Sequence, residues 1–304
     1  MNYPITLYSP KDLSRLSAFL NANWQHDSIS ETVLREKLEG DPHWMPEATF
    51  ICKDGDKIIG FMQGVIRDIS ETRYAYIKLM AVDEAYRRNG IASAMYEKLE
   101  AIFIEQKADV VRIYDVPLNY FMPGIDPRYT AALCWAMRKG FKRFGDTSNL
   151  LVDLNQNWDM SKKELALQAN NIVVRRAKPD EEQAVLEFIK DEWLLWNNEV
   201  KMAFQDELPS IHIALLNGQV KAFSAHNANN KGTGWFGPMG THPDLRGKGL
   251  GAILLKRCLQ DMKEMGLSHS IIPWVGPIDF YSQIANALVD RVFWRYEKKL
   301  CSKH

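Results

Sequence analysis

The strongest constraint on the fold of this chain is that its pattern of predicted elements occurs twice. The pair Asp54-Gly55 lies between two apolar runs, and the pair Asn217-Gly218 lies between two others. Both pairs tolerate positive φ, which a tight turn between antiparallel strands requires, so each predicts a β-hairpin. A further strand, a glycine-containing loop and a helix follow each hairpin. This repetition predicts two copies of one architecture.

The segments around each hairpin complete the repeat. Residues 74–82 predict a third strand in the first copy, and residues 235–241 predict its counterpart in the second. Pro238 lacks the N–H that a regular ladder needs, so we expect a bulge or a splay there. Helical sequence precedes each hairpin, and another strand and helix follow each loop. The predicted fold class is α/β, in the α+β sense, with two tandem domains that each have a mixed, mostly antiparallel sheet flanked by helices.

Chain length agrees with this division. The 304 residues suit two domains of ordinary size. Hydrophobic residues make up 46% and charged residues 25%, so each domain can bury a core. The polar stretch 155–170 is typical of a linker that is partly helical. We place the domain boundary near Gln168, giving domains of residues 1–168 and 169–304.

The charge balance disfavours polyanionic partners. Lysine plus arginine equals aspartate plus glutamate at 38 each, so no net field attracts nucleic acid or an anionic membrane. No apolar run approaches the ~20 residues of a membrane span, and the first residues do not resemble an export signal. We therefore expect a cytoplasmic protein.

The cysteines indicate neither a metal site nor a disulfide framework. Cys52, Cys134, Cys258 and Cys301 lie far apart, without CxxC spacing or histidines at zinc-site intervals. We expect reduced thiols in the core.

Two short stretches carry the chemistry: Arg87-Arg88-Asn89-Gly90-Ile91-Ala92 and Arg246-Gly247-Lys248-Gly249-Leu250-Gly251. Each lies between a predicted strand and a predicted helix. Small residues there let successive backbone N–H groups converge on an anion at the helix N-terminus, and the basic side chains add local charge. A diphosphate suits such a loop. A dinucleotide-binding Rossmann domain fits less well, because antiparallel hairpin sequence precedes the loop.

Both stretches resemble the [Arg/Gln]-x-x-Gly-x-[Gly/Ala] coenzyme A loop of the GNAT acyltransferases, and the resemblance covers the chain twice. It implies that each loop holds the pyrophosphate of acyl-CoA and that the preceding strand pairs with the pantetheine arm. Besides the two loops, the cofactor-binding residues implied are Ala81, Val82, Met239, Gly240 and Thr241. The resemblance extends to tandem members such as mycothiol synthase.

The reaction that the resemblance implies is direct attack of a primary amine on the thioester of acetyl-CoA. Backbone donors near Met239-Gly240-Thr241 would stabilise the oxyanion, and such donors are commonly worth ~3 kcal/mol. The departing thiolate needs a proton, which a tyrosine of a Phe-Tyr-x-x-x-Gly-Phe pattern often supplies in this family. Phe280-Tyr281 matches the start of that pattern, so Tyr281 is the predicted catalytic acid, although the glycine and the second phenylalanine are missing.

The first copy lacks a tyrosine at this position, which favours the C-terminal domain as the catalytic one. Tyr120 or Tyr129 could substitute in the first copy. His226 and Glu192 are candidate bases, each with a structural role as the competing explanation.

Several features have two interpretations. The residues Trp193 and Trp196 fit an aromatic acceptor pocket or core packing, and residues 123–128 fit a substrate-facing loop or a simple turn.

The alternative function is a non-catalytic CoA-binding sensor or partner-binding module. An aminoacyl-tRNA-dependent transferase is disfavoured by the two coenzyme loops and by the neutral charge. The acceptor, a small amine or a peptide, and the choice between monomer and homodimer stay open.

Overall fold

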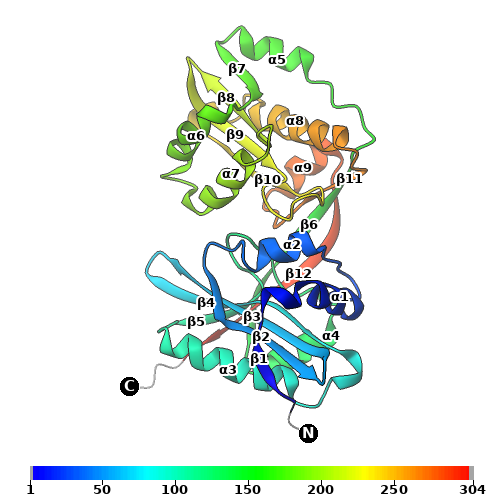
Figure 1. Cartoon of the computed structure of the whole chain (residues 1–304). Helices are drawn as coiled ribbons and strands as arrows, with labels where there is room; N and C mark the ends of the chain where they lie inside the picture. The colour runs from blue at the N-terminus through cyan, green and yellow to red at the C-terminus, as the bar shows by residue number, and fades with distance from the viewer. Residues whose placement is uncertain (1–2, 301–304) are drawn as a thin grey trace. The chain divides into compact units, whose positions relative to one another are not determined.

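The computed structural model describes residues 3–300 and contains two compact units (Figure 1). Unit 1 comprises Met1–Thr147 and Phe293–His304, and unit 2 comprises Ser148–Val292. The chain therefore leaves unit 1, forms all of unit 2, and returns to unit 1 for its last segment. The predicted domain boundary near Gln168 stays a prediction.

Unit 1 is a mixed sheet with helices on both faces. Its elements are β1 (Ile5–Leu7), α1 (Leu13–Asn23), α2 (Glu31–Lys37), β2 (Trp44–Asp54), β3 (Lys57–Ile69), β4 (Thr72–Val82), α3 (Ile91–Glu105), β5 (Val110–Ile113), α4 (Thr130–Arg138), the first part of β6 (Lys142–Asp153) and the last part of β12 (Leu288–Lys299). The strand order is β1-β2-β3-β4-β5-β12. Only the pairing of β4 with β5 is parallel among the described pairs of this unit.

Alternation along the strands separates two cores in unit 1. Phe50 and Cys52 of β2 face a cluster that includes Leu99 of α3, whereas Ile51 between them faces a cluster with Leu16 of α1. Successive side chains of a strand point to opposite faces, so a sheet covered on both sides buries nearly every strand residue.

Unit 2 contains the second repeat. Its elements are the end of β6, α5 (Ser161–Gln168), β7 (Ile172–Arg176), α6 (Glu182–Ile189), α7 (Asn197–Phe204), β8 (Ile211–Leu216), β9 (Gln219–His226), β10 (Phe236–Thr241), α8 (Leu250–Glu264), β11 (His269–Ile272), α9 (Ile278–Ala285) and the start of β12. Strands β10-β9-β8-β7 form an antiparallel sheet, and β11 pairs with the end of β6.

Both predicted hairpins are confirmed. Asp54 pairs with Lys57 across the first turn, and Leu216 pairs with Gln219 across the second. The expected bulge at Pro238 is confirmed as well, since the register between β10 and β9 shifts between Phe236 and Met239. The linker is partly helical, as predicted, because it contains α5. These findings confirm the predicted fold class of two repeats with mostly antiparallel sheets flanked by helices. The sheet of unit 1 is mixed, whereas the four-stranded sheet of unit 2 is antiparallel.

The cysteines within residues 3–300 are free, but not all of them belong to a core. Cys52 and Cys258 are buried, as expected, whereas Cys134 is partly exposed and lines a cavity, so the expectation of a core thiol is wrong there. Cys301 lies outside the described residues.

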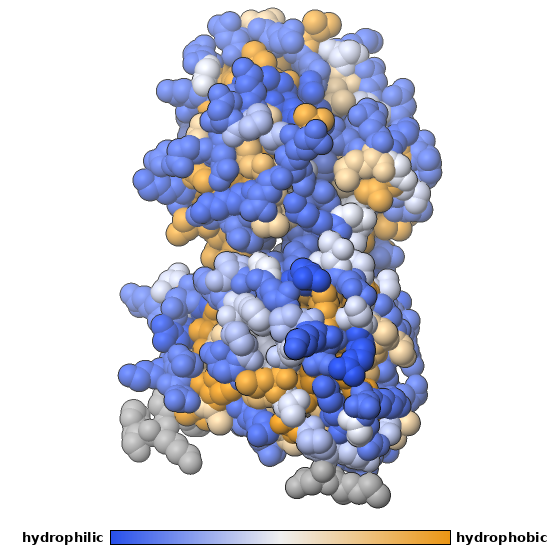
Figure 2. Space-filling view, viewed as in Figure 1, coloured by the Kyte–Doolittle hydropathy of each residue, from blue (hydrophilic) through white to orange (hydrophobic). Residues whose placement is uncertain are grey.

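Polar residues cover most of the visible face, with apolar residues confined to smaller patches (Figure 2). Among the described residues, no helix combines the length and the apolar character that crossing a membrane requires.

Candidate acyl-CoA sites

The two glycine loops have the same backbone conformation. Gly90 precedes α3 with φ 80° and ψ −2°, and Gly249 precedes α8 with φ 81° and ψ 6°. Glycine tolerates this left-handed conformation, which lets the chain turn sharply from a short 3-10 helix into the α-helix. A Cβ added at either glycine would meet open space, so no other group lies close to the Cβ side of these glycines. Uncovered N–H groups at a helix start favour an anion.

The central strand of each repeat separates from its parallel neighbour just before the loop. In unit 1, β4 pairs with β5 only from Tyr74 to Ile77, and the N–H of Tyr114 donates to the carbonyl of Ile77 at 2.8 Å. In unit 2, a single parallel bridge joins Trp235 to Ile271 where β10 begins. Beyond these points each central strand has lost its parallel neighbour and stays paired only on its other side, β4 with β3 and β10 with β9, which leaves an opening on the side of the lost partner.

A bulge accompanies the separation in unit 1. Gln63 pairs with Leu79 and Gly64 with Ile77, which leaves Lys78 as the extra residue of β4. A bulge bends a strand and re-aims its side chains. The sequence did not indicate this bulge, because Lys78 lies in an otherwise regular strand pattern.

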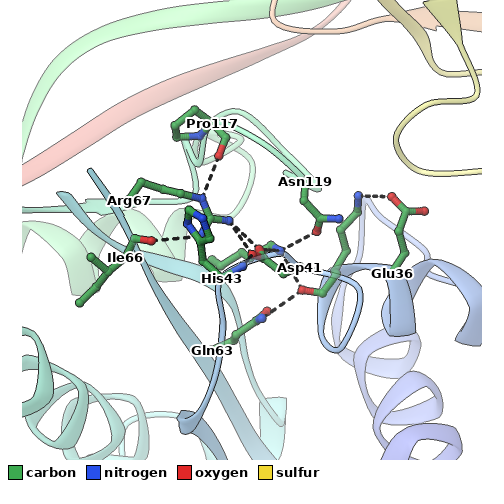
Figure 3. A network of polar contacts seen from close by, with 10 residues as sticks. Glu36, Asp41, His43, Gln63, Ile66, Arg67, Pro117 and Asn119 are labelled. Carbon is green, nitrogen blue, oxygen red and sulfur yellow. Dashed lines mark hydrogen bonds and ion pairs between the residues drawn. The ribbon is translucent and has the colours of Figure 1, made fainter. Parts of the chain in front are cut away.

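A buried polar network fixes this bulge (Figure 3). The Asp41 carboxylate accepts hydrogen bonds from Arg67 at 2.6 and 2.8 Å and from Lys78 Nζ. Lys78 also donates to Asn119 Oδ1 and to the carbonyl of Lys37, both at 2.7 Å. Although burial opposes ionisation, the cations Lys78 and Arg67 hold the pKa of Asp41 below its ordinary value. The network ties the end of α2 to β4 and to the loop after β5.

A cavity of about 780 Å³ occupies the opening in unit 1. Trp24, Tyr114, Met122 and Tyr129 line it together with residues of the loop and of β4. The predicted residues that line it are Ala81, Val82, Arg87, Arg88, Gly90, Ile91 and Ala92. The volume is within the range of small-molecule sites. Asn89 instead donates a side-chain hydrogen bond to the carbonyl of Tyr86 at 3.3 Å.

The second loop borders a different cavity, of about 540 Å³. Gly247, Lys248 and Gly249 line it with residues of α5, β7 and β8. Leu250 is buried at the start of α8. The cavity-lining residues from α5 belong to the linker, which the sequence did not connect with the loop.

Trp193 and α9 lie close to the opening in unit 2. A Cβ placed on Gly240 would lie 3.3 Å from the Trp193 ring, and one placed on Gly251 would lie 3.4 Å from the Phe280 ring. Trp193 also stacks on Trp196 with 5.8 Å between ring centroids. These contacts place an indole against β10 and the start of α9 beside α8.

Tyr281 lies in the apolar core of unit 2 and is 9% exposed. Its ring packs edge-on against Phe236, with centroids 6.0 Å apart, and burial raises the pKa of its hydroxyl to about 12. Asn286 adopts the left-handed conformation that ends α9, as Gly140 does after α4. The spacing in sequence from Tyr281 to Asn286 equals the spacing from the buried Trp135 to Gly140. Counted back from the left-handed residue after each helix, Trp135 is therefore the counterpart of Tyr281.

The two candidate bases have other partners. His226 is buried, with Nε2 at 3.0 Å from Asp261, and His212 shares the same carboxylate oxygen at 2.6 Å. Glu192 forms an exposed ion pair with Arg246 at 3.6 Å. The structure thus places His226 in a buried cluster and Glu192 beside the second loop.

Of the remaining predicted features, some line the unit 1 cavity and others pack against neighbouring side chains. Arg128, at the end of the 123–128 loop, lines the unit 1 cavity and pairs with Asp126 at 2.6 Å. Tyr120 packs near Tyr76 and Val65 instead. Sequence reasoning missed Trp24 and Tyr114, although Trp24 follows the first helix of its repeat much as Trp193 follows α6.

Fold and site together define a class: a transferase with two GNAT-type repeats, each with a separated central strand and a glycine loop. The chain belongs to the acetyltransferase (GNAT) family, whose model matches residues 16–119 and 173–283. Acyl transfer is the general activity of this family, and its members use acyl-CoA.

Solved structures share the fold over nearly the whole chain. The glucosamine N-acetyltransferase region of a fungal multi-domain GH3 beta-N-acetylglucosaminidase is 18% identical with a TM-score of 0.82, covering 98% of this chain and 38% of that one. A GNAT protein of Sphaerobacter thermophilus is 16% identical with a TM-score of 0.69, covering 98% and 95%. A tandem GNAT protein of the clavulanic acid biosynthesis pathway is 13% identical with a TM-score of 0.68, covering 98% of both chains.

This chain spans well under half of the fungal protein. At these identities the likeness concerns the fold alone. Among curated proteins, none matches the sequence.

Proposed function

We propose that this protein transfers the acetyl group of acetyl-CoA to a primary amine. The observation that carries the proposal is the unit 1 cavity, which joins an open glycine loop to the separated end of β4. A diphosphate at the loop would accept hydrogen bonds from the start of α3, and Arg87 and Arg88 would neutralise its charge. The acyl arm would then lie along Met80, Ala81 and Val82.

The acceptor in this proposal is a small molecule, with an amino sugar as the first to test. The support is the fold of the fungal glucosamine N-acetyltransferase region, whose shared architecture covers almost all of this chain. A peptide amine is the other candidate class. In this proposal the protein acts as a monomer or homodimer in the cytoplasm, without nucleic acid or membrane partners. A similarity to mycothiol synthase is also part of the proposal.

The C-terminal copy is the proposed catalytic copy, with Tyr281 as the acid that protonates the thiolate. Two observations support this assignment. The ring of Phe280, the residue before Tyr281, lies beside Gly251 at the start of α8. The Tyr281 hydroxyl, whose pKa burial raises to about 12, is protonated at neutral pH, as a proton donor must be. Gly240 and Thr241, at the end of β10, would supply the backbone donor for the oxyanion.

A thiol-release assay with acetyl-CoA and glucosamine tests the proposal. Gly90→Val and Gly249→Val form a matched pair, because both replace a glycine at nearly the same positive φ. A left-handed conformation costs an L-residue roughly 1–2 kcal/mol, so either change distorts its own loop. We expect transfer by the wild type and reduced transfer by Gly249→Val. Saturable binding of acetyl-CoA without thiol release would favour the non-catalytic sensor instead.

A further inference from the structure

We infer that unit 1 contains a second acyl-transfer centre, in which Tyr129 moves the protons and Asp27 positions the Tyr129 hydroxyl. The inference rests on the proposed function, since it requires acetyl-CoA at the first loop. Its structural basis is the hydrogen bond from Tyr129, which lines the unit 1 cavity, to Asp27, which is not among the lining residues. The position of Tyr281 has no tyrosine counterpart in this copy.

The hydroxyl of Tyr129 is oriented by two contacts. It donates to Asp27 Oδ2 at 2.7 Å and accepts from the backbone N–H of His26 at 3.0 Å. The His26 ring packs edge-on against the Tyr129 ring at 5.2 Å. Tyr129 is the residue before α4, and Asp27 lies on the segment between α1 and α2. Two contacts at one oxygen direct the phenolic proton toward the carboxylate.

Tyr129 lines the same cavity as the glycine loop. Tyr114 lines the same cavity and marks the last backbone contact between β5 and β4. Burial raises the pKa of Tyr114, and the charges of Tyr129 and Asp27 raise it further. Trp24 closes this region by donating from Nε1 to the carbonyl of Met80 at 3.2 Å. A coenzyme with its diphosphate at Gly90 and its arm along β4 would bring its thioester to this point.

Tyr129, positioned by Asp27, can carry out both proton transfers of the reaction. The amine nitrogen attacks the acetyl carbonyl, the C–N bond forms and the C–S bond breaks. Tyr129 gives its proton to the coenzyme A thiolate, and its phenolate oxygen then takes the proton that the amine loses, while Asp27 holds that oxygen in place through their hydrogen bond. The products are the acetylated amine and coenzyme A, and both side chains return to their starting states.

The test isolates unit 1 in the Gly249→Val background, in the full-length protein. Thiol release from acetyl-CoA is measured with glucosamine and with water as acceptors. Tyr129→Phe keeps the ring and removes the hydroxyl, and Asp27→Ala removes the carboxylate that positions this hydroxyl. General acid–base groups contribute roughly 10² to 10⁴-fold, so we expect kcat to fall by at least about 10²-fold in Tyr129→Phe and to fall in Asp27→Ala as well. The Kd of acetyl-CoA from calorimetry should stay within about threefold.

Two further measurements separate catalysis from a packing role. Added formate should restore part of the rate to Asp27→Ala, which a purely structural aspartate would not allow. Tyr8→Phe is the matched control, since it also removes a tyrosine–carboxylate hydrogen bond in unit 1, from Tyr8 to Glu39 at 2.9 Å. It should leave the rate within about twofold.

The outcomes are distinct. The inference is overturned if Gly249→Val alone abolishes transfer while acetyl-CoA still binds, or if Tyr129→Phe leaves the rate unchanged in that background. Absence of transfer by the wild type with every acceptor would overturn the proposed function itself. If the Asp27→Ala variant does not fold, the rate of the nearly isosteric Tyr129→Phe variant decides whether the inference holds.

Discussion

Arg87 and Arg246 hold the same place in the two copies, each with Nε donating to the last carbonyl of the strand before it. The acceptors are Val82 at 3.3 Å and Thr241 at 3.2 Å. The main-chain angles of the two arginines also agree, at φ −61° and ψ 157° and at φ −61° and ψ 153°. One local design therefore positions a guanidinium beside each glycine loop.

Replacement of either arginine should weaken acetyl-CoA binding in its own copy. Hydrogen bonds to charged groups contribute about 1.5–3 kcal/mol, so Arg87→Ala and Arg246→Ala should each raise one Kd by roughly 10- to 100-fold. Titration calorimetry measures this change. Arg73→Ala, which removes an exposed arginine paired with Asp68, is the control and should bind normally. Equal binding by all three variants would contradict the role of the loops.

Asp41 should be among the most sensitive positions for stability. Its carboxylate is fully buried between Lys78 and Arg67, and removal of one member of a buried ion pair costs about 3–5 kcal/mol. Asp41→Asn should lower the free energy of unfolding of unit 1 by that order in urea denaturation. Asp68→Asn disrupts the exposed pair with Arg73 and should cost less than about 1 kcal/mol. Similar losses of unfolding free energy in both variants would show that the buried ion pairs of Asp41 stabilise the fold no more than the exposed pair does.

The same aspartate predicts a pH dependence. The pKa of Asp41 is lowered in the folded protein, whereas an unfolded aspartate titrates near ~3.9. The ionised group therefore stabilises the fold fully above about pH 4, and this stabilisation is lost as the pH falls through the lower folded pKa. The stability difference between wild type and Asp41→Asn should shrink below pH 4 in denaturation at several pH values. A difference independent of pH would refute this linkage.

Tyr281→Phe tests the proposed acid of the C-terminal copy. In the Gly90→Val background, loss of the hydroxyl should lower transfer by roughly 10²-fold or more. The melting temperature should change little, because the ring keeps its contact with Phe236. Unchanged turnover in this background would remove Tyr281 from the mechanism.

The repeat and the loops could be predicted from sequence because their physics is local. Asn217-Gly218 specifies a hairpin through backbone angles alone, and Gly90 and Gly249 allow the left-handed turn that starts a helix. Pro238 predicted its bulge for the same reason, since a missing N–H is visible in the sequence.

Features that depend on tertiary contacts could not be predicted in this way. The strands β6 and β12 each begin in one compact unit and end in the other. Nothing in their residues indicates that they pass from one unit to the other. The bulge at Lys78 depends on the distant Asp41, and the burial of His226 depends on Asp261 of α8. The pairing of Tyr129 with Asp27 likewise joins segments far apart in the chain.

Titration of the purified wild-type protein with acetyl-CoA tests the central claim most directly. We predict saturable heat of binding that weakens in Gly90→Val and in Gly249→Val, with each change affecting its own site. No detectable binding at millimolar acetyl-CoA, for a protein that is folded by circular dichroism, would contradict the assignment of both loops.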